Sequence, residues 1–198
     1  TGRTPVFASI RAAEARLVEE APNKVYLPIE GPAGYVECVQ DLLFERNEPV
    51  RREGRLRTVQ AIGGTGALRV AVELIRRVNP GAAVWVSDPT WPNHPGIVTA
   101  AGLKVRRYPV WNPSTGRADP MATVAALEQA TPGDAVILQA CCHNPTGADP
   151  DGEGWQVILD AVVRNRLRAI FDFAYQGFAR SVGADANVLA AAEARGLE

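Results

Sequence analysis

Residues 170–178 have the sequence Ile-Phe-Asp-Phe-Ala-Tyr-Gln-Gly-Phe, and this stretch decides the fold that we predict. It is an apolar run interrupted by one carboxylate, Asp172, and it ends in turn residues. Such a run is typical of a buried strand in a parallel sheet. A lone carboxylate there is strongly destabilising unless a cation or hydrogen-bond donors meet it. Asp172 therefore needs either an arginine or helix N-terminus in the core, or a cationic ligand at the carboxyl end of the strand.

The chain before this stretch alternates between predicted strands and predicted helices, which is the pattern of a parallel sheet with crossover helices. The predicted strands span 58–62, 82–87, 104–110, 135–140 and 168–174. The predicted helices span 67–78, 93–101, 120–129 and 155–164, with Asp119 as the N-cap of the third. The fold class that follows is α/β, without a linker that would divide the chain.

Two further helices are predicted before the sheet. Thr4 and Pro5 have the chemistry of an N-cap and a first helical position. A core-facing stripe at helical spacing follows them, formed by Val6, Ile10, Ala13 and Leu17. The second helix spans about 34–45 and is expected to bury Val36, Val39 and Leu43. The arginine-rich residues 51–57 are predicted to form a solvated connector.

The composition limits the kind of protein. The chain has 198 residues, 46% of them hydrophobic, and a net charge of −1, so it can build a core and is no basic nucleic-acid binder. Its three cysteines without metal-binding spacing favour a reduced, cytoplasmic setting. Its two histidines are too few for a histidine-based metal site. No apolar run has the length of a membrane span.

Several loops that follow predicted strands carry polar or aromatic residues. Gly63-Gly64-Thr65-Gly66 is either a phosphate cradle at a helix start or an ordinary turn. Trp91, between two prolines, either stacks on an aromatic ligand or packs in the core.

The other residues at these strand ends allow a binding role or a structural one. The Asn144 amide suits a ligand hydroxyl or carboxylate, although Asn-Pro-Thr-Gly is also a common turn. Tyr175 either hydrogen-bonds a ring oxygen or packs at the rim of the sheet. His94 either hydrogen-bonds Asp172 or is an ordinary buried or surface histidine.

These signals agree in position. Successive strand ends present a phosphate cradle, a stacking ring, an amide and a buried anion. A planar, phosphorylated, cationic heteroaromatic satisfies all of them, and pyridoxal 5'-phosphate is such a molecule.

The sequence resembles the class I aspartate and aromatic-amino-acid aminotransferases, which have the type I fold of pyridoxal-phosphate enzymes. Five motifs in family order carry the resemblance: Tyr-Leu-Pro-Ile-Glu-Gly at 26–31, Gly-Gly-Thr-Gly-Ala-Leu-Arg at 63–69, Ser-Asp-Pro-Thr-Trp-Pro-Asn-His at 87–94, Ala-Cys-Cys-His-Asn-Pro-Thr-Gly-Ala-Asp at 140–149 and Phe-Asp-Phe-Ala-Tyr-Gln-Gly-Phe at 171–178. The resemblance implies a three-layer α/β/α sandwich and transfer of an amino group between an L-amino acid and a 2-oxo acid.

The resemblance also implies roles for individual residues. Gly64 and Thr65 would bind the cofactor phosphate, and Asp172, supported by His94, would pair with the ring nitrogen. Trp91 would stack on the ring, and Asn144 and Tyr175 would contact the ring hydroxyl. Trp91 and Asn144 would also bind the substrate. Tyr26 would reach the phosphate of the neighbouring subunit, which implies a homodimer.

The sequence also departs from the family. Transamination requires a lysine that bonds the cofactor and transfers a proton. In the family this lysine stands in a Ser-Lys motif beyond a further helix and strand, and neither Lys24 nor Lys104 matches it. We therefore expect the catalytic lysine to lie beyond Glu198, and none of the 198 residues to take its role.

It follows that residues 1–198 are expected to be the N-terminal part of the cofactor-binding large domain of a longer enzyme, and to be inactive alone. The expected remainder comprises an N-terminal arm, the last strands of the sheet and a small domain.

Smaller departures are the Gln139 side chain, where the family often has a histidine, and two glycines that weaken the start of the helix after the 142–150 loop, Gly152 and Gly154. Two alternative functions remain open at this point. One is another type I pyridoxal-phosphate enzyme, such as a lyase or decarboxylase. The other is a non-catalytic phosphate- or nucleotide-binding α/β domain.

Overall fold

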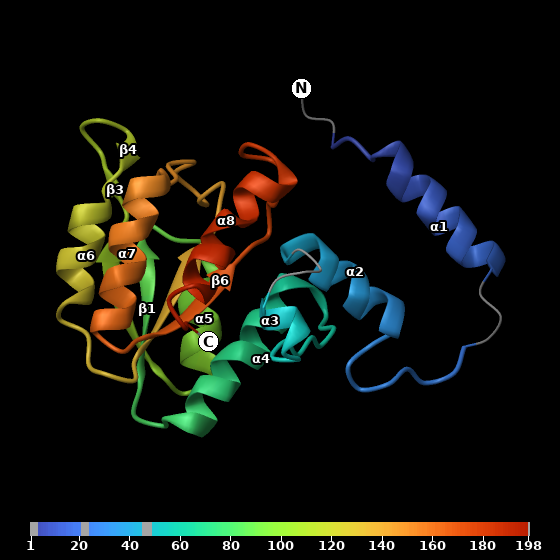
Figure 1. Cartoon of the computed structure of the whole chain (residues 1–198), viewed down its shortest axis with the longest axis horizontal. Coiled ribbons are helices and arrows are strands. Elements are labelled where there is room, and N and C mark those ends of the chain that lie inside the picture. Colours follow the sequence, from blue (N-terminus) through green and yellow to red (C-terminus); the bar gives the residue numbers. More distant parts are fainter. Residues whose placement is uncertain (1–3, 21–23, 45–48, 198) are drawn as a thin grey trace.

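A four-stranded parallel sheet forms the centre of the protein (Figure 1). This computed structural model describes residues 4–20, 24–44 and 49–197. In the order in which they lie side by side, the strands are β2 (Lys104–Pro109), β1 (Ala83–Asp88), β5 (Ala135–Gln139) and β6 (Arg168–Asp172). Because all three pairings are parallel, the carboxyl ends of the strands meet at one edge.

Helices cover both faces of this sheet. One face is packed by α4 (Gly63–Val78) and α5 (Asn93–Ala100), and the other by α6 (Pro120–Leu127), α7 (Gly152–Arg164) and α8 (Val182–Glu193). Successive strand residues point to opposite faces, so Val84 and Val86 lie in one core and Trp85 in the other. The predicted three-layer α/β/α sandwich is confirmed.

Local signals fix several helix starts. The Asp119 carboxylate accepts a hydrogen bond from the Ala122 N–H at 3.0 Å, as predicted for the N-cap of α6. Asp151 caps α7 in the same way, so that helix begins three residues before the predicted position, at Gly152. Before α6 the chain forms a short antiparallel hairpin of β3 (Trp111–Asn112) and β4 (Arg117–Ala118).

Two predictions about the first βα unit were wrong. Residues 58–62 form no strand, because a strand requires a neighbour that pairs along its length. The backbone of this segment makes a hydrogen bond from Gln60 N–H to the Glu30 carbonyl, 2.9 Å long, and not a ladder. The Gly63–Gly66 stretch is not a separate turn either, since α4 begins at Gly63 and contains it.

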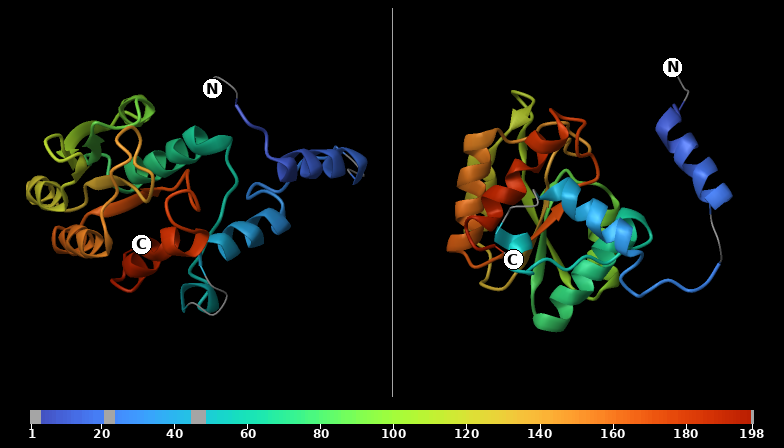
Figure 2. Two further views of the ribbon diagram at one scale, coloured as in Figure 1. Left: turned by 90° about the horizontal axis from the view of Figure 1, so that it is seen from above. Right: turned by 45° about the vertical axis from the view of Figure 1, so that its right-hand side comes forward.

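The predicted core contacts of the N-terminal helices were also wrong. α1 (Ala8–Glu20) begins four residues after Thr4 and lies apart from the sheet (Figure 2). Its stripe does not face a core; all four members are exposed: Val6, Ile10, Ala13 and Leu17. α2 (Ala33–Leu43) packs against α8 and has no fully buried residue, so its three predicted apolar positions are half-buried. The predicted end at Glu45 lies outside the described residues.

The predicted solvated connector, residues 51–57, is mostly exposed, with Arg51 and Leu56 half-buried. Its first two residues belong to a helical turn, α3 (Pro49–Arg52), which buries the preceding Val50. Arg51 donates to Asp41 at the end of α2, and Arg55 donates to Glu193 in α8. These ion pairs tie the arginine-rich segment to helices on either side of it.

Candidate active site

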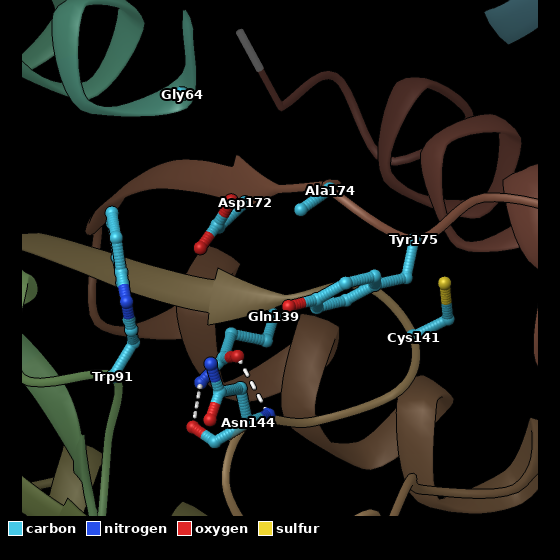
Figure 3. Close-up of a pocket in the computed structure, with 8 residues that line it drawn as sticks. All are labelled: Gly64, Trp91, Gln139, Cys141, Asn144, Asp172, Ala174 and Tyr175. Carbon is cyan, nitrogen blue, oxygen red and sulfur yellow. Dashed lines mark hydrogen bonds between the residues drawn. The ribbon is translucent and has the colours of Figure 1, made fainter. Parts of the chain in front are cut away.

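A cavity of about 140 Å³ lies at the carboxyl ends of β5 and β6. Figure 3 shows the side chains of Trp91, Asp172 and Tyr175 pointing toward the space that they share. Its lining comes from four separate stretches of the chain: Gly64, Trp91, Gln139, Cys141, Asn144, Asp172, Ala174 and Tyr175. The parallel sheet therefore brings together the strand ends that we predicted to carry a ligand site.

Asp172 is the last residue of β6, and its side chain is 16% exposed. His94 Nε2 lies 2.9 Å from Asp172 Oδ2, and His94 Nδ1 lies 2.6 Å from the Thr90 hydroxyl. A carboxylate can only accept, so His94 Nε2 donates to Asp172, and the Thr90 hydroxyl holds the opposite nitrogen of the ring. This chain of contacts fixes the direction of the carboxylate.

The partner of Asp172 excludes an arginine in the core, one of the explanations that the sequence left open. Within the described ranges its hydrogen-bond partner is His94, and no arginine lies against it. The buried His94 also contacts Trp91, with ring centroids 5.4 Å apart in an edge-on arrangement. The hydrogen bond expected between His94 and Asp172 is therefore present, and the carboxylate borders the cavity and not an arginine.

Asn144 stands in a loop that is held by three side chains. The Asp149 carboxylate accepts hydrogen bonds from the N–H groups of Cys142 and His143, at 2.7 and 2.8 Å. The His143 ring lies 2.8 Å from the Thr146 hydroxyl and 2.9 Å from the hydroxyl of Ser87. The third side chain is that of Gln139, whose amide faces the backbone of Asn144 (Figure 3).

Buried polar groups near the cavity have altered proton affinities. Burial lowers the pKa of His143 from its usual value of 6.5, and the neighbouring Asp149 only partly opposes this. Burial raises the pKa of Cys141 to about 12, so this cavity-lining thiol stays protonated near neutral pH. Neither group carries a charge into the cavity at that pH.

The turn that carries Tyr175 is held by hydrogen bonds to the Asp185 side chain. This buried carboxylate of α8 accepts hydrogen bonds from the N–H groups of Gly177, Ala179 and Arg180, at 2.9 to 3.2 Å. Burial by itself would raise the pKa of Asp185, but these donors hold it below its usual value. The sequence analysis did not predict α8, although Ser181 caps it.

Gly64 lies in the first turn of α4, where backbone N–H groups lack partners within the helix. A Cβ built on Gly64 would meet no atom within 4 Å, so the backbone is open to a ligand there. A second cavity of about 540 Å³ shares Gly64 and Asp172 with the first. Thr65 is exposed and lines neither cavity.

Tyr26 does not join the site within one chain. It is 102% exposed, in the segment between α1 and α2, and it lines neither of the two cavities. Thr90, which lies behind His94, was not predicted from the sequence. Gln139 was noted only as a departure from the family, and its contact with Asn144 was not predicted. A polar residue at the end of the buried 135–139 run was the available signal for Gln139.

The two lysines of the sequence do not join the site either. Lys104 begins β2, so it lies at the end of the sheet opposite the cavity, and Lys24 lies in the exposed segment after α1. Neither lines either of the two cavities. Glu198, beyond which we predicted the catalytic lysine, lies outside the described residues, so the position of that lysine stays a prediction.

The arrangement can bind a flat, phosphorylated cation. The carboxylate accepts a proton-bearing nitrogen, the indole offers a stacking face, and the first turn of α4 favours an anion. The described part of the chain contains no group of three or more metal-ligating side chains. None of its helices is long and apolar enough to cross a membrane.

This chain is similar to known proteins over nearly its whole length. The family model described as aminotransferase class I and II matches residues 1–196. An aspartate aminotransferase of Salmonella typhi is 44% identical over 191 residues, which is 96% of this chain and 48% of that protein. An aromatic-amino-acid aminotransferase of Pseudomonas aeruginosa is 43% identical over 93% of the chain and 46% of its own length.

Solved structures of aminotransferases are also similar to this chain. The crystal structure of an aromatic-amino-acid aminotransferase from Burkholderia pseudomallei, covalently bound to pyridoxal phosphate, has a TM-score of 0.94 and 40% identity over 98% of this chain and 48% of that one. The cytoplasmic aspartate aminotransferase of Saccharomyces cerevisiae has a TM-score of 0.92 at 34% identity, over 98% and 48%. The chain spans about half the length of the relatives that it matches.

Proposed function

The chain belongs to the class I and II aminotransferases, and on this premise we propose that it serves the pyridoxal-phosphate-dependent transfer of an amino group. The donor is an L-amino acid, either aspartate or an aromatic one, and the acceptor is a 2-oxo acid. Relatives named for aspartate and for aromatic amino acids match it about equally well, at 44% and 43% identity, which supports this substrate class without choosing within it.

One observation carries the proposal: Asp172 ends the half-buried edge strand β6 beside Trp91 and Asn144, and its hydrogen-bond partner among the described residues is His94. A carboxylate of this kind suits the protonated nitrogen of a pyridine ring. Without a cationic ligand, this half-buried anion would have little compensation.

The residues of the cavity fit pyridoxal 5'-phosphate. Asp172 would hold the ring nitrogen, Trp91 would lie against the ring face, and the amide of Asn144 and the hydroxyl of Tyr175 would serve the ring hydroxyl. The phosphate would lie at the start of α4, near Gly64, where a Cβ would meet only open space. Thr65 stays a proposed further donor to the phosphate.

The bound ring supplies an electron sink for the carbanion that forms at the substrate Cα. Asp172 favours this chemistry because a carboxylate beside the nitrogen keeps the ring protonated. His94 and Thr90 keep that carboxylate turned toward the ring. Trp91 covers the ring and, with Asn144, would orient the substrate carboxylate.

Transamination also needs an amine that moves the proton at the substrate carbon. Neither Lys24 nor Lys104 is placed to do so, since both lie away from the cavity. We propose that the lysine lies beyond Glu198 and that the 198-residue chain alone does not transaminate.

We further propose a homodimer in the cytoplasm. The full exposure of Tyr26 suits a side chain that contacts the cofactor phosphate of a second subunit. The three free thiols, Cys38, Cys141 and Cys142, suit a reducing compartment.

The test has two parts. Formation of 2-oxo acid from aspartate or phenylalanine with 2-oxoglutarate is measured with the product of the complete gene and with the 198-residue chain. We expect activity from the first and none from the second. Titration of the chain with pyridoxamine 5'-phosphate, which forms no bond to lysines, should quench its tryptophan fluorescence. An inactive complete protein, or an active chain, would contradict the proposal.

A further inference from the structure

Gln139 lies at the base of the cavity, at the end of β5, with 9% of its surface exposed. Its side-chain amide makes two hydrogen bonds to a single residue. Gln139 Nε2 donates to the Asn144 carbonyl at 3.1 Å, and Gln139 Oε1 accepts from the Asn144 N–H at 2.8 Å (Figure 3). One side chain therefore pairs with both backbone polar groups of Asn144.

This pairing links Asn144 to Asp172 through rigid structure. Gln139 and Asp172 are register partners on adjacent parallel strands, so the spacing of their Cα atoms is fixed by the sheet. The two hydrogen bonds then fix the backbone of Asn144 relative to that pair. No hydrogen bond to the Asn144 carboxamide is found in the described parts of the chain, so this group is available to a ligand while Gln139 holds the backbone that carries it.

Other side chains that hold this loop act on neighbouring residues. Asp149 binds the N–H groups of Cys142 and His143, and the His143 ring binds Thr146. Among the described residues, Gln139 is the side chain that holds Asn144 itself. Loss of Gln139 would thus release Asn144 while the rest of the loop stays anchored.

We propose that Gln139 is a positioning residue, which holds Asn144 so that its carboxamide meets the hydroxyl of a pyridoxal-type ring whose nitrogen faces Asp172. The proposal rests on the proposed function. It also explains the choice of side chain. The oxygen and nitrogen of an amide point the same way and match one residue's N–H and C=O, whereas the two nitrogens of an imidazole diverge. An amide also holds Asn144 equally at every pH, because it does not titrate.

The first experiment needs no ligand. Amide hydrogen exchange is measured by NMR for the native chain and for Gln139→Leu, which keeps a similar size but cannot hydrogen-bond. We expect the Asn144 N–H to exchange about tenfold faster in Gln139→Leu, because it loses its hydrogen bond; this change corresponds to about 1.4 kcal/mol. The N–H groups of Cys142 and His143 should keep their protection. Unchanged exchange at Asn144 would overturn the proposal.

The second experiment separates positioning from general loosening. Affinity is measured for pyridoxamine 5'-phosphate and for its 3-deoxy analogue, which lacks the ring hydroxyl. We expect Gln139→Leu to weaken the first by about tenfold and the second much less. Thr123→Val is the matched control, since its buried hydroxyl also holds the backbone, through one proton directed at the Pro109 and Asp119 carbonyls, and it lines neither of the two cavities. The control should leave both affinities unchanged.

The outcomes are distinguishable. Equal losses for both ligands in Gln139→Leu, or none, would overturn the positioning role. A native chain that binds neither ligand would overturn the proposed function, and with it the role toward a ring, while the exchange result still decides whether Gln139 holds Asn144. Should Gln139→Leu not fold, Gln139→Glu replaces it. An ionised carboxylate keeps the acceptor for the Asn144 N–H but lacks the donor for its carbonyl, so we expect protected exchange with weakened binding of pyridoxamine 5'-phosphate.

Discussion

The N-terminal helices and the sheet both carry apolar residues that predict a buried face, but their surroundings in the structure are opposite. α1 and α2 contain no buried residue, whereas all five residues of β5 are buried. In the sheet, each apolar face meets a helix layer of the same chain. In α1, the stripe meets solvent (Figure 1). Periodicity therefore predicts a helix and its apolar face, but it does not predict whether another part of the chain covers that face.

The largest expected effect separates the two regions directly. Leu159 in α7 is fully buried, and Leu17 in α1 is 70% exposed. Leu159→Ala should lower the free energy of unfolding by about 2–5 kcal/mol, through lost burial and a cavity. Leu17→Ala should change it by less than about 0.5 kcal/mol. Urea denaturation of both variants measures this, and similar losses would show that α1 packs on the core.

A pair of glycines sharpens the same contrast. A Cβ on Gly154 in α7 would lie 2.7 Å from Pro120 Cγ in α6, whereas one on Gly34 in α2 would meet nothing within 4 Å. We expect Gly154→Ala to destabilise the protein by about 1–3 kcal/mol through overpacking. Gly34→Ala should be neutral or stabilise by up to about 1 kcal/mol, since alanine favours helix. Thermal unfolding of both variants measures these changes. If Gly154→Ala is as stable as the native protein, the contact between α6 and α7 is loosely packed.

Ligand binding should also differ between a substitution in the cavity and one in the N-terminal helices. Asp172→Asn should weaken pyridoxamine 5'-phosphate binding by about 10- to 100-fold, because a charged hydrogen bond of about 1.5–3 kcal/mol becomes a neutral one. Tyr35→Phe, on the exposed surface of α2, should leave binding unchanged. Fluorescence titration gives both constants. Equal affinities of the native protein and Asp172→Asn for pyridoxamine 5'-phosphate would show that the Asp172 carboxylate does not contact the ligand.

The smallest effect concerns pH. Because burial lowers the pKa of His143 below 6.5, the unfolded state binds more protons than the folded state just below that pH. The free energy of unfolding should therefore fall as the pH drops below 6.5, by at most about 1.4 kcal/mol per pH unit from this group. His143→Gln should flatten the slope between about pH 6.5 and 5. If His143→Gln shows the same dependence of the free energy of unfolding on pH as the native protein, groups other than His143 cause that dependence. The N-terminal helices contain no histidine and should contribute nothing to it.

How much the sequence predicted depends on how local the cause is. The four strands of the parallel sheet and the Asp119 cap follow from nearby residues, and they were predicted to within a few positions, whereas the short β3–β4 hairpin was not predicted. Residues 58–62 have strand-like composition, but pairing requires a distant neighbour, which no local pattern reports. The alanine-rich α8 has no clear apolar stripe, so only its Ser181 cap could have indicated it.

The site shows the same division. The strand ends bring Trp91, Asn144 and Asp172 to one cavity because parallel strands end together, and this was predictable. The hydrogen bonds from Gln139 to Asn144 depend on how the intervening loop turns back, over five residues, and spacing alone did not reveal them. Tyr26 is exposed and lines neither of the two cavities, so its predicted role stays a prediction.

The central claim is that Asp172 holds the nitrogen of a vitamin-B6 ring. A crystal structure of the chain grown with pyridoxamine 5'-phosphate tests it most directly. We predict a ring between Trp91 and the end of β6, with its nitrogen within about 3 Å of an Asp172 carboxylate oxygen. A ring bound elsewhere, or bound there with its nitrogen turned away from Asp172, would contradict the claim.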